Sequence, residues 1–174
     1  PFVKQSIKGT LEAMEGLPVT IRLLDPPLHE FVPQSQEKQA ELAASLGISA
    51  EEVRKRGEQL HESNPMMGHR GVRLGITYPE VTEMQVRAIF EAAAELLKAG
   101  KKCKPEIMIP VTSDVRELRH QKAICMRVYD EVLGRMGMRQ IPHAFGTMIE
   151  IPRACLLADR MAEEAEFFSF GTND

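Results

Sequence analysis

Glu150 and Asp174 are the residues whose type and spacing most clearly predict chemistry. Glu150 follows the short apolar run Gly146-Thr-Met-Ile149, and Asp174 follows Phe170-Gly-Thr-Asn173. A stretch with helical spacing separates the two runs. Two buried parallel strands joined by a helix would bring both carboxylates to one rim of a sheet. The alternative is that one acid merely flanks a helix and the other merely ends the chain.

Paired carboxylates at such a rim are suited to magnesium. Mg²⁺ binds oxygen ligands and usually takes one or two carboxylates, with water and substrate oxygens completing a shell of about six. The sequence therefore predicts a Mg²⁺ site formed by Glu150 and Asp174.

Arg22 lies inside an apolar run that extends from Pro18 to Asp25. A guanidinium buried without a partner is costly, so it needs an anion or a carboxylate nearby. One interpretation is a structural ion pair with Asp25 or Glu150. The other is a clamp on a phosphoryl group, to which the planar fork of arginine is suited. Asp25 is expected to orient Arg22 or to cap the turn before Pro26.

The elements that must position these residues alternate between strands and helices. Strands are expected over residues 18–25, 106–111, 145–150 and 167–171, with a short fifth strand over 70–76. Helices are expected over 79–99, from Ser113-Asp114 to Met136, and over 152–163. A further pair, 34–46 and a helix that opens at the Ser49-Ala-Glu-Glu52 capping box and runs to about Ser63, lacks a wide apolar stripe. We expect this pair, near residues 34–63, to be a solvent-facing insertion.

This order predicts an α/β fold with a parallel sheet covered by helices. Two architectures fit: an open doubly wound sheet, or part of a TIM (β/α)8-type barrel with about five of the eight strands present. A full barrel needs roughly 250 residues and carries its chemistry at the carboxyl ends of its strands. Arg22, Glu150, Asn173 and Asp174 fall at or near such ends.

Composition narrows the class of protein. The 174 residues suggest one domain, and a formal net charge of −3 argues against a general nucleic-acid binder. No run resembles a membrane span or a signal peptide. Because the chain starts at Pro1, we expect it to be a piece of something longer. Cys103, Cys125 and Cys155 are expected to be small core residues in a reducing compartment.

Four motifs carry a family resemblance. They are Ile21-Arg-Leu-Leu-Asp-Pro-Pro-Leu-His-Glu-Phe31, Asn64-Pro-Met-Met-Gly-His-Arg-Gly-Val-Arg73, Met148-Ile-Glu-Ile-Pro-Arg-Ala154 and Phe170-Gly-Thr-Asn-Asp174. Together they resemble the C-terminal phosphoenolpyruvate/pyruvate-binding barrel of the pyruvate, phosphate dikinase family, over essentially the whole chain. The last two motifs are shared with the wider phosphoenolpyruvate-utilising group, whereas the first is the narrower signature.

The resemblance implies a partial barrel over residues 1–174 and a set of site residues. Mg²⁺ would be held by Glu150 and Asp174, and Arg22 and Arg70 would act on the transferring phosphoryl group. The substrate would be contacted by Gly171, Thr172 and Asn173 as well as by Arg22 and the two acids. Arg73 is expected to be a structural or solvent-facing residue.

The resemblance also implies an enzyme, a phosphotransferase with paired acceptors. Phosphate would pass, with Mg²⁺, between a phosphohistidine on another domain and pyruvate to give phosphoenolpyruvate, with ATP and phosphate handled elsewhere. The expected partners are phosphoenolpyruvate or pyruvate, the phosphohistidine domain and a second subunit in a homodimer, with no nucleic acid and no membrane. The expected compartment is the cytoplasm, or a plastid in a plant.

Two family features find no match in this sequence. The family's proton-transferring cysteine lies in a Cys-Gly-Glu-His-type segment of the last strand, and an arginine lies in an Arg-Thr-Glu-His motif of the first strand. We therefore expect the first and last barrel strands to be missing and this chain alone to be inactive. The alternatives are a phosphoenolpyruvate synthase, an enzyme resembling enzyme I of the sugar phosphotransferase system, and a truncated, non-catalytic barrel module.

Overall fold

The computed structural model describes residues 2–26, 33, 35–60 and 67–171. The chain divides into two compact units, which are described separately. The first unit contains Pro1–Leu24 and Gly71–Asp174, and the second contains Asp25–Arg70.

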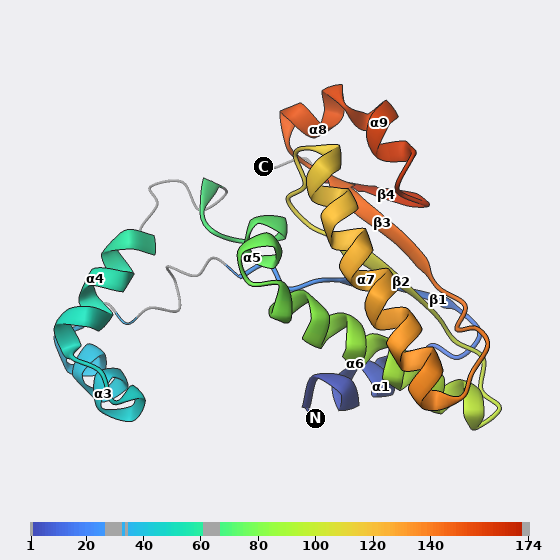
Figure 1. Cartoon of the computed structure of the whole chain (residues 1–174), viewed down its shortest axis with the longest axis horizontal. Helices are drawn as coiled ribbons and strands as arrows, with labels where there is room; N and C mark the ends of the chain where they lie inside the picture. The colour runs from blue at the N-terminus through green and yellow to red at the C-terminus, as the bar shows by residue number, and fades with distance from the viewer. Residues whose placement is uncertain (1, 27–32, 34, 61–66, 172–174) are drawn as a thin grey trace. The chain divides into compact units, whose positions relative to one another are not determined.

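The first unit is built on a four-stranded parallel sheet. Its strands are β1 (Pro18–Arg22), β2 (Lys104–Ile109), β3 (Ala144–Ile149) and β4 (Phe167–Phe170) (Figure 1). Their order across the sheet is the same as their order in the chain. A doubly wound sheet would reverse this order at a switch point, whereas a barrel keeps it. The sheet is therefore a curled half-barrel, which confirms the partial TIM-type barrel.

The expected strand over residues 70–76 is wrong, so the described residues form four strands rather than five. This stretch is the short helix α5 (Val72–Thr77). Val72 and Leu74 are buried, whereas Ile76 is exposed. The segment makes helical hydrogen bonds, from the Gly75 amide to the Gly71 carbonyl oxygen at 3.1 Å and from the Tyr78 amide to the Leu74 carbonyl oxygen at 2.8 Å, and it packs against α6 and α7. Glycine at position 75 allows this close packing, because a Cβ there would lie 2.6 Å from the Thr82 hydroxyl oxygen and 2.7 Å from Gln121 Oε1.

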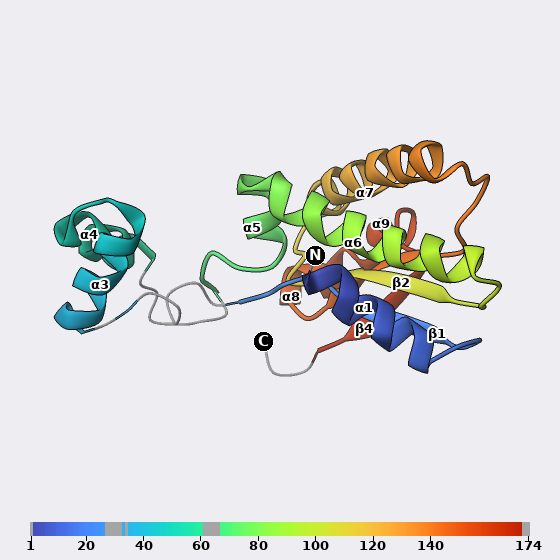
Figure 2. The same ribbon diagram turned by 90° about the horizontal axis from the view of Figure 1, so that it is seen from below.

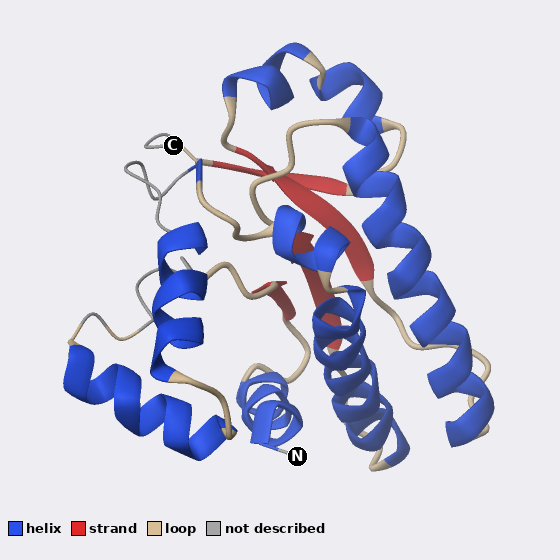
Figure 3. Ribbon diagram, turned by 60° about the vertical axis from the view of Figure 1, so that its left-hand side comes forward, coloured by secondary structure: helices blue, strands red, loops and turns tan. Residues whose placement is uncertain are grey.

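Two long helices cover one face of the sheet. Helix α6 (Pro79–Lys98) begins with proline in its first turn and ends before Gly100, and α7 (Val115–Met136) ends at Gly137 in a left-handed conformation. Helix α7 opens with a capping box in which Asp114 accepts from the Arg116 amide and Glu117 accepts from the Asp114 amide. Figures 2 and 3 show both helices lying along the strands. Their stop and start signals were the ones expected from sequence.

Two other helical segments differ from expectation. No element was expected before Pro18, yet Phe2–Ala13 forms helix α1, which packs on α6 through its buried face at Ile7 and Leu11. The spacing of these two residues is helical but spans only one turn. The single helix expected over 152–163 is broken at Leu157 into α8 (Pro152–Leu156) and α9 (Ala158–Ala162).

The two faces of the sheet have different side chains. The face toward the helices supplies Leu23, Ile107, Ile109, Phe145 and Ile149 to a core completed by apolar residues of α6 and α7. Because strand side chains alternate, the opposite face carries Thr20, Arg22, Glu106, Met108, Gly146, Met148, Phe167 and Ser169. This second face is where the polar side chains of the strands gather.

The second unit contains α3 (Gln36–Leu46) and α4 (Ala50–Leu60), as the insertion near residues 34–63 predicted. The Ser35 side chain caps α3, and Gly47 ends it with a φ of 68°. The Ser49 hydroxyl accepts from the Glu52 amide at the start of α4. Most side chains of both helices are exposed, which fits their narrow apolar stripes.

Two of the three cysteines lie in the core, as expected, and one does not. Cys103 and Cys125 are buried, and burial raises the pKa of the Cys125 thiol to about 12. Cys155 on α8 is exposed, so its expected place in the core is wrong. None of the helices in the described ranges is both long and apolar enough to cross a membrane.

Candidate functional site

Glu150 is a buried carboxylate directly after the carboxyl end of β3. The residue is only 6% exposed. By the alternation of the strand, it belongs to the face of the sheet that α6 and α7 do not cover. Its Oε1 accepts a hydrogen bond from the Val111 amide at 2.6 Å. A charged acceptor paired with a backbone donor makes a short and strong hydrogen bond. The Glu150 carboxylate is therefore held in one orientation by the connection that follows β2.

Val111 has an unusual backbone conformation. Its φ is +61°, and it is the one non-glycine residue with positive φ in the described parts of the chain. The left-handed region is strained for a β-branched residue. The side chain is 3% exposed. The surrounding structure must therefore impose this conformation on the residue that donates to Glu150.

Gly171 lies against the other oxygen of Glu150. Its amide continues the sheet by donating to the Ile149 carbonyl oxygen at 3.1 Å. A Cβ at Gly171 would lie 2.8 Å from the Glu150 Cβ and 3.1 Å from Oε2. Only glycine leaves this approach unobstructed. The Glu150 carboxylate is an oxygen ligand of the type that a hard cation takes, although the described part of the chain contains no group of three or more His, Cys, Asp or Glu side chains that could hold a metal.

Arg22 ends β1 on the face that the helices leave open. Its neighbours Ile21 and Leu23 pack into the core, whereas Arg22 is exposed. Within the residues that the structure describes, Arg22 forms no ion pair with Asp25 or Glu150. The structural pair considered from sequence is therefore not observed there, and the guanidinium is presented at the carboxyl end of its strand.

Asp25 pairs with Arg70 rather than with Arg22. In the second unit, Arg70 Nε and Nη2 donate to the two Asp25 carboxylate oxygens at 2.8 and 2.7 Å. Both side chains are largely buried. This bidentate arrangement fixes the plane of the guanidinium. The expectation that Asp25 orients Arg22 is therefore wrong, because Asp25 pairs with Arg70, 45 residues away in the sequence.

The remaining expected site residues lie outside the described ranges or in the second unit. Thr172, Asn173 and Asp174 lie outside the described residues. The expectation that Asp174 faces Glu150 therefore stays a prediction. Arg70 belongs to the second unit, so its participation in one site with Arg22 and Glu150 also stays a prediction. Among the expected residues, the described structure brings together Glu150 and Gly171.

Val111, which contacts Glu150, and the neighbouring pair Thr112 and Thr147 were not predicted from the sequence. Thr112 and Thr147 are completely buried, and their hydroxyl oxygens lie 2.9 Å apart. The run Pro110-Val-Thr-Ser-Asp114 was interpreted only as a strand end and a helix cap. One signal was available: a polar residue within an apolar strand, such as Thr147, commonly has a hydrogen-bonding role when buried.

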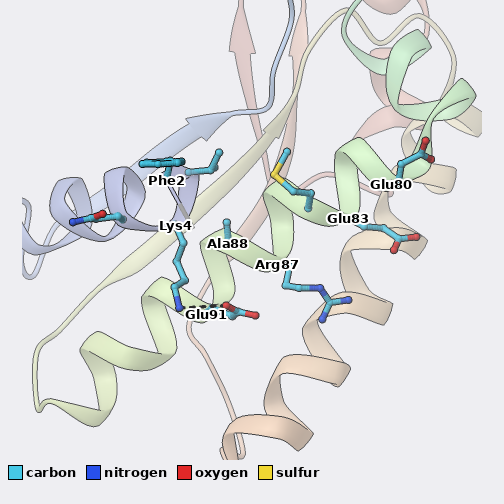
Figure 4. Close-up of a pocket in the computed structure, with 10 residues that line it drawn as sticks. Phe2, Lys4, Glu80, Glu83, Arg87, Ala88 and Glu91 are labelled. Atoms are coloured by element: carbon cyan, nitrogen blue, oxygen red, sulfur yellow. Dashed lines mark ion pairs between the residues drawn. The ribbon is translucent and has the colours of Figure 1, made fainter. Parts of the chain in front are cut away.

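A separate groove of about 890 Å³ lies between α1 and α6. Figure 4 shows its walls, where Lys4 pairs with Glu91 at 3.5 Å. Phe2 is 87% exposed at its edge. Its lining comprises Phe2, Val3, Lys4, Gln5, Glu80, Glu83, Met84, Arg87, Ala88 and Glu91. Its charged side chains pair mainly with one another and with α7, so it presents no cluster suited to chemistry.

Comparison with known proteins gives a consistent result. Residues 3–174 match the family model described as PEP-utilising enzyme, PEP-binding domain. The chain is 53% identical over 175 residues to "Pyruvate, phosphate dikinase" of Clostridium symbiosum. It is 52% identical over 176 residues to the chloroplastic enzyme of Flaveria trinervia and 53% identical over 176 to "Pyruvate, phosphate dikinase 2" of Zea mays.

These matches cover all of this chain but only part of each relative. The share is 20% of the Clostridium symbiosum protein, 18% of the Flaveria trinervia protein and 20% of the Zea mays protein. The chain thus spans about a fifth of the length of the curated relatives that it matches.

Proposed function

The chain belongs to the PEP-utilising enzyme family, and from this premise we propose that it is the phosphoenolpyruvate/pyruvate-binding domain of a pyruvate, phosphate dikinase. The activity is the transfer of a phosphoryl group between a phosphohistidine and pyruvate. The similarity to three dikinases at 52–53% identity supports this choice over a phosphoenolpyruvate synthase or an enzyme I.

The buried Glu150 carboxylate carries the proposal. It follows a parallel strand at its carboxyl end, and in barrels this edge holds the chemistry. Its Oε1 is fixed by the Val111 amide, and Gly171 places no side chain against Oε2. We infer that Glu150 and Asp174 hold Mg²⁺. When bound, Mg²⁺ would supply Lewis-acid stabilisation to the enolate form of pyruvate.

The arginines have a separate proposed role. Phosphoryl transfer develops charge on three oxygens, and catalysis depends on positioning and on charge balance. Arg22, exposed at the carboxyl end of β1, supplies a planar donor for this purpose. Arg70, with its guanidinium plane fixed by Asp25, supplies a second. Gly171, Thr172 and Asn173 would bind the carboxylate and bridging oxygen of the substrate.

The partners belong to the same proposal. We propose that the phosphohistidine lies on another domain of a longer polypeptide, and the length of the relatives, about five times that of this chain, supports this. By resemblance, that polypeptide is a homodimer. Its compartment is the cytoplasm, or the plastid in a plant, in line with the chloroplastic protein of Flaveria trinervia.

The test is a calorimetric titration of oxalate, a planar mimic of the pyruvate enolate, into the intact polypeptide with Mg²⁺. The Glu150→Gln variant keeps an oxygen that can accept from Val111 but loses the charge. We expect its oxalate dissociation constant to rise about a hundredfold, because a metal ligand contributes several kcal/mol.

The matched control is Glu106→Gln. Glu106 is on β2 and accepts a hydrogen bond from the Thr20 hydroxyl at 2.8 Å, on the same face of the sheet but at its other end. This variant should bind oxalate as the wild type does. Equal affinity in the wild type and in Glu150→Gln would refute the proposed metal site.

A further inference from the structure

Every residue of the connection between β2 and α7, residues 110–114, takes part in a hydrogen bond. The Pro110 carbonyl oxygen accepts from the Val72 amide at 3.1 Å, and the Val111 amide donates to Glu150. The Ser113 and Asp114 amides both donate to Glu117 Oε2, at 2.8 and 3.0 Å. Such complete pairing is unusual for a loop, which commonly is more mobile than the elements it joins.

Thr147 holds the segment on both sides of Val111. Its hydroxyl donates to the Ile109 carbonyl oxygen at 2.8 Å, and its oxygen lies 2.9 Å from the Thr112 hydroxyl oxygen. A hydroxyl has one proton to donate, so Thr112 is the donor in the second contact. One side chain of β3 therefore binds the residues that flank the dipeptide Pro110-Val111.

These two hydrogen bonds of Thr147 matter because Val111, which lies between their partners, is strained. An isolated valine avoids a φ of +61°, at a cost of about 1–2 kcal/mol. Relaxation of Val111 would move its amide away from Glu150. Bonds at Ile109 and Thr112 restrict such relaxation, because both neighbours are tied to the same buried hydroxyl.

We propose that Thr147 and Thr112 are positioning residues for the metal-binding carboxylate. Their paired hydroxyls hold the Val111 amide in its left-handed conformation, and that amide fixes Glu150 Oε1 so that Oε2 is presented at Gly171. This inference rests on the proposed role of Glu150 in binding a divalent cation. Groups that orient a metal ligand typically change metal affinity about 10- to 100-fold when they are removed.

The test is Mn²⁺ binding to the intact polypeptide, followed by electron paramagnetic resonance. The Thr147→Val variant removes the hydroxyl while it keeps the shape. We expect the Mn²⁺ population that is lost in Glu150→Gln to bind about tenfold more weakly in Thr147→Val. Thr147→Ser, which restores the hydroxyl, should bind within about twofold of the wild type.

The matched control is Thr82→Val. Thr82 is also buried, and its hydroxyl donates to Gln121 Oε1 at 2.8 Å, between α6 and α7. Its loss should cost similar stability without any change in Mn²⁺ affinity. An equal loss of affinity in Thr82→Val and Thr147→Val would show that only general stability had been affected, and would overturn the inference.

A second measurement does not depend on metal. Hydrogen exchange of the segment 110–114 in the metal-free protein should be faster in Thr147→Val and Thr112→Val than in Thr82→Val. Unchanged exchange together with unchanged Mn²⁺ affinity would contradict the positioning role. If Glu150→Gln instead binds Mn²⁺ as the wild type does, the proposed metal site fails, and the inference fails with it.

Discussion

On the helix-covered face of the sheet, β2 and β3 present Ile107, Ile109, Phe145 and Ile149, all nearly or fully buried. On the opposite face the same strands present Glu106, Met108, Gly146 and Met148, and β1 adds Arg22. Adjacent residues of one strand thus serve different purposes. The covered face supplies most of the apolar core, and the other face, with its carboxyl rim, carries the candidate site residues Arg22 and Glu150.

The two faces of the sheet should contribute unequally to the stability of the fold. Ile107→Ala on the covered face should lower the free energy of unfolding by about 4 kcal/mol, because a fully buried side chain leaves a cavity. Met148→Ala on the opposite face, where the side chain is half-buried, should cost about 1 kcal/mol. Urea unfolding of the two variants measures the difference, and equal losses would disprove it.

The Arg22→Lys variant tests whether the opposite face serves function rather than stability. The charge stays but the planar fork is lost, so turnover should fall about a hundredfold, as it does when one transition-state donor is removed. The free energy of unfolding should change by less than about 0.5 kcal/mol, because Arg22 is exposed. The measurements are phosphoenolpyruvate formation by the intact polypeptide and urea unfolding. Normal turnover in Arg22→Lys would refute the proposed role of Arg22 in binding the phosphoryl group.

The smallest effect concerns the cap of the covering helix α7. Hydrogen bonds from Arg116 hold the pKa of Asp114 well below its usual range. The unfolded chain therefore takes up a proton at higher pH than the folded chain does, so the stabilisation is complete above about pH 4 and is lost as the pH falls. Asp114→Asn should be about 0.5 kcal/mol less stable at pH 7.

The check is a series of urea unfolding curves from pH 7 to pH 2. Asparagine still caps a helix but does not titrate, so the difference in the free energy of unfolding between the wild type and Asp114→Asn should become smaller toward pH 2. A difference that stayed constant with pH would contradict the role of the Asp114 charge.

The covered face was largely predictable from sequence, because apolar runs and helix caps have strong local signals. Gly137 and the Asp114 cap marked the ends of α7 within a residue. The helix within residues 70–76 was not predicted, because the stretch is short and its packing against Gln121, 46 residues beyond Gly75, has no local sequence signal.

The main residue of the candidate site was predicted from the sequence, but the residues that hold it in place were not. Glu150 was identified by its position after an apolar run. Its hydrogen bond to Val111 crosses 39 residues of sequence and depends on a backbone angle that valine rarely adopts. The pairing of Asp25 with Arg70 likewise crosses 45 residues, whereas local reasoning had favoured the nearby Arg22.

The agreement between strand order and chain order has a consequence for how the sheet assembles. The β2–β3 pair Ile109 and Thr147 is separated by 38 residues, whereas the β1–β2 pair Thr20 and Glu106 is separated by 86. Each doubling of a closed loop costs only about 0.6 kcal/mol of chain entropy, so the second unit between β1 and β2 is inexpensive at equilibrium. Its effect is on kinetics, since distant contacts form late. The strand that carries Arg22 should therefore join the sheet last, after a β2–β4 nucleus has formed.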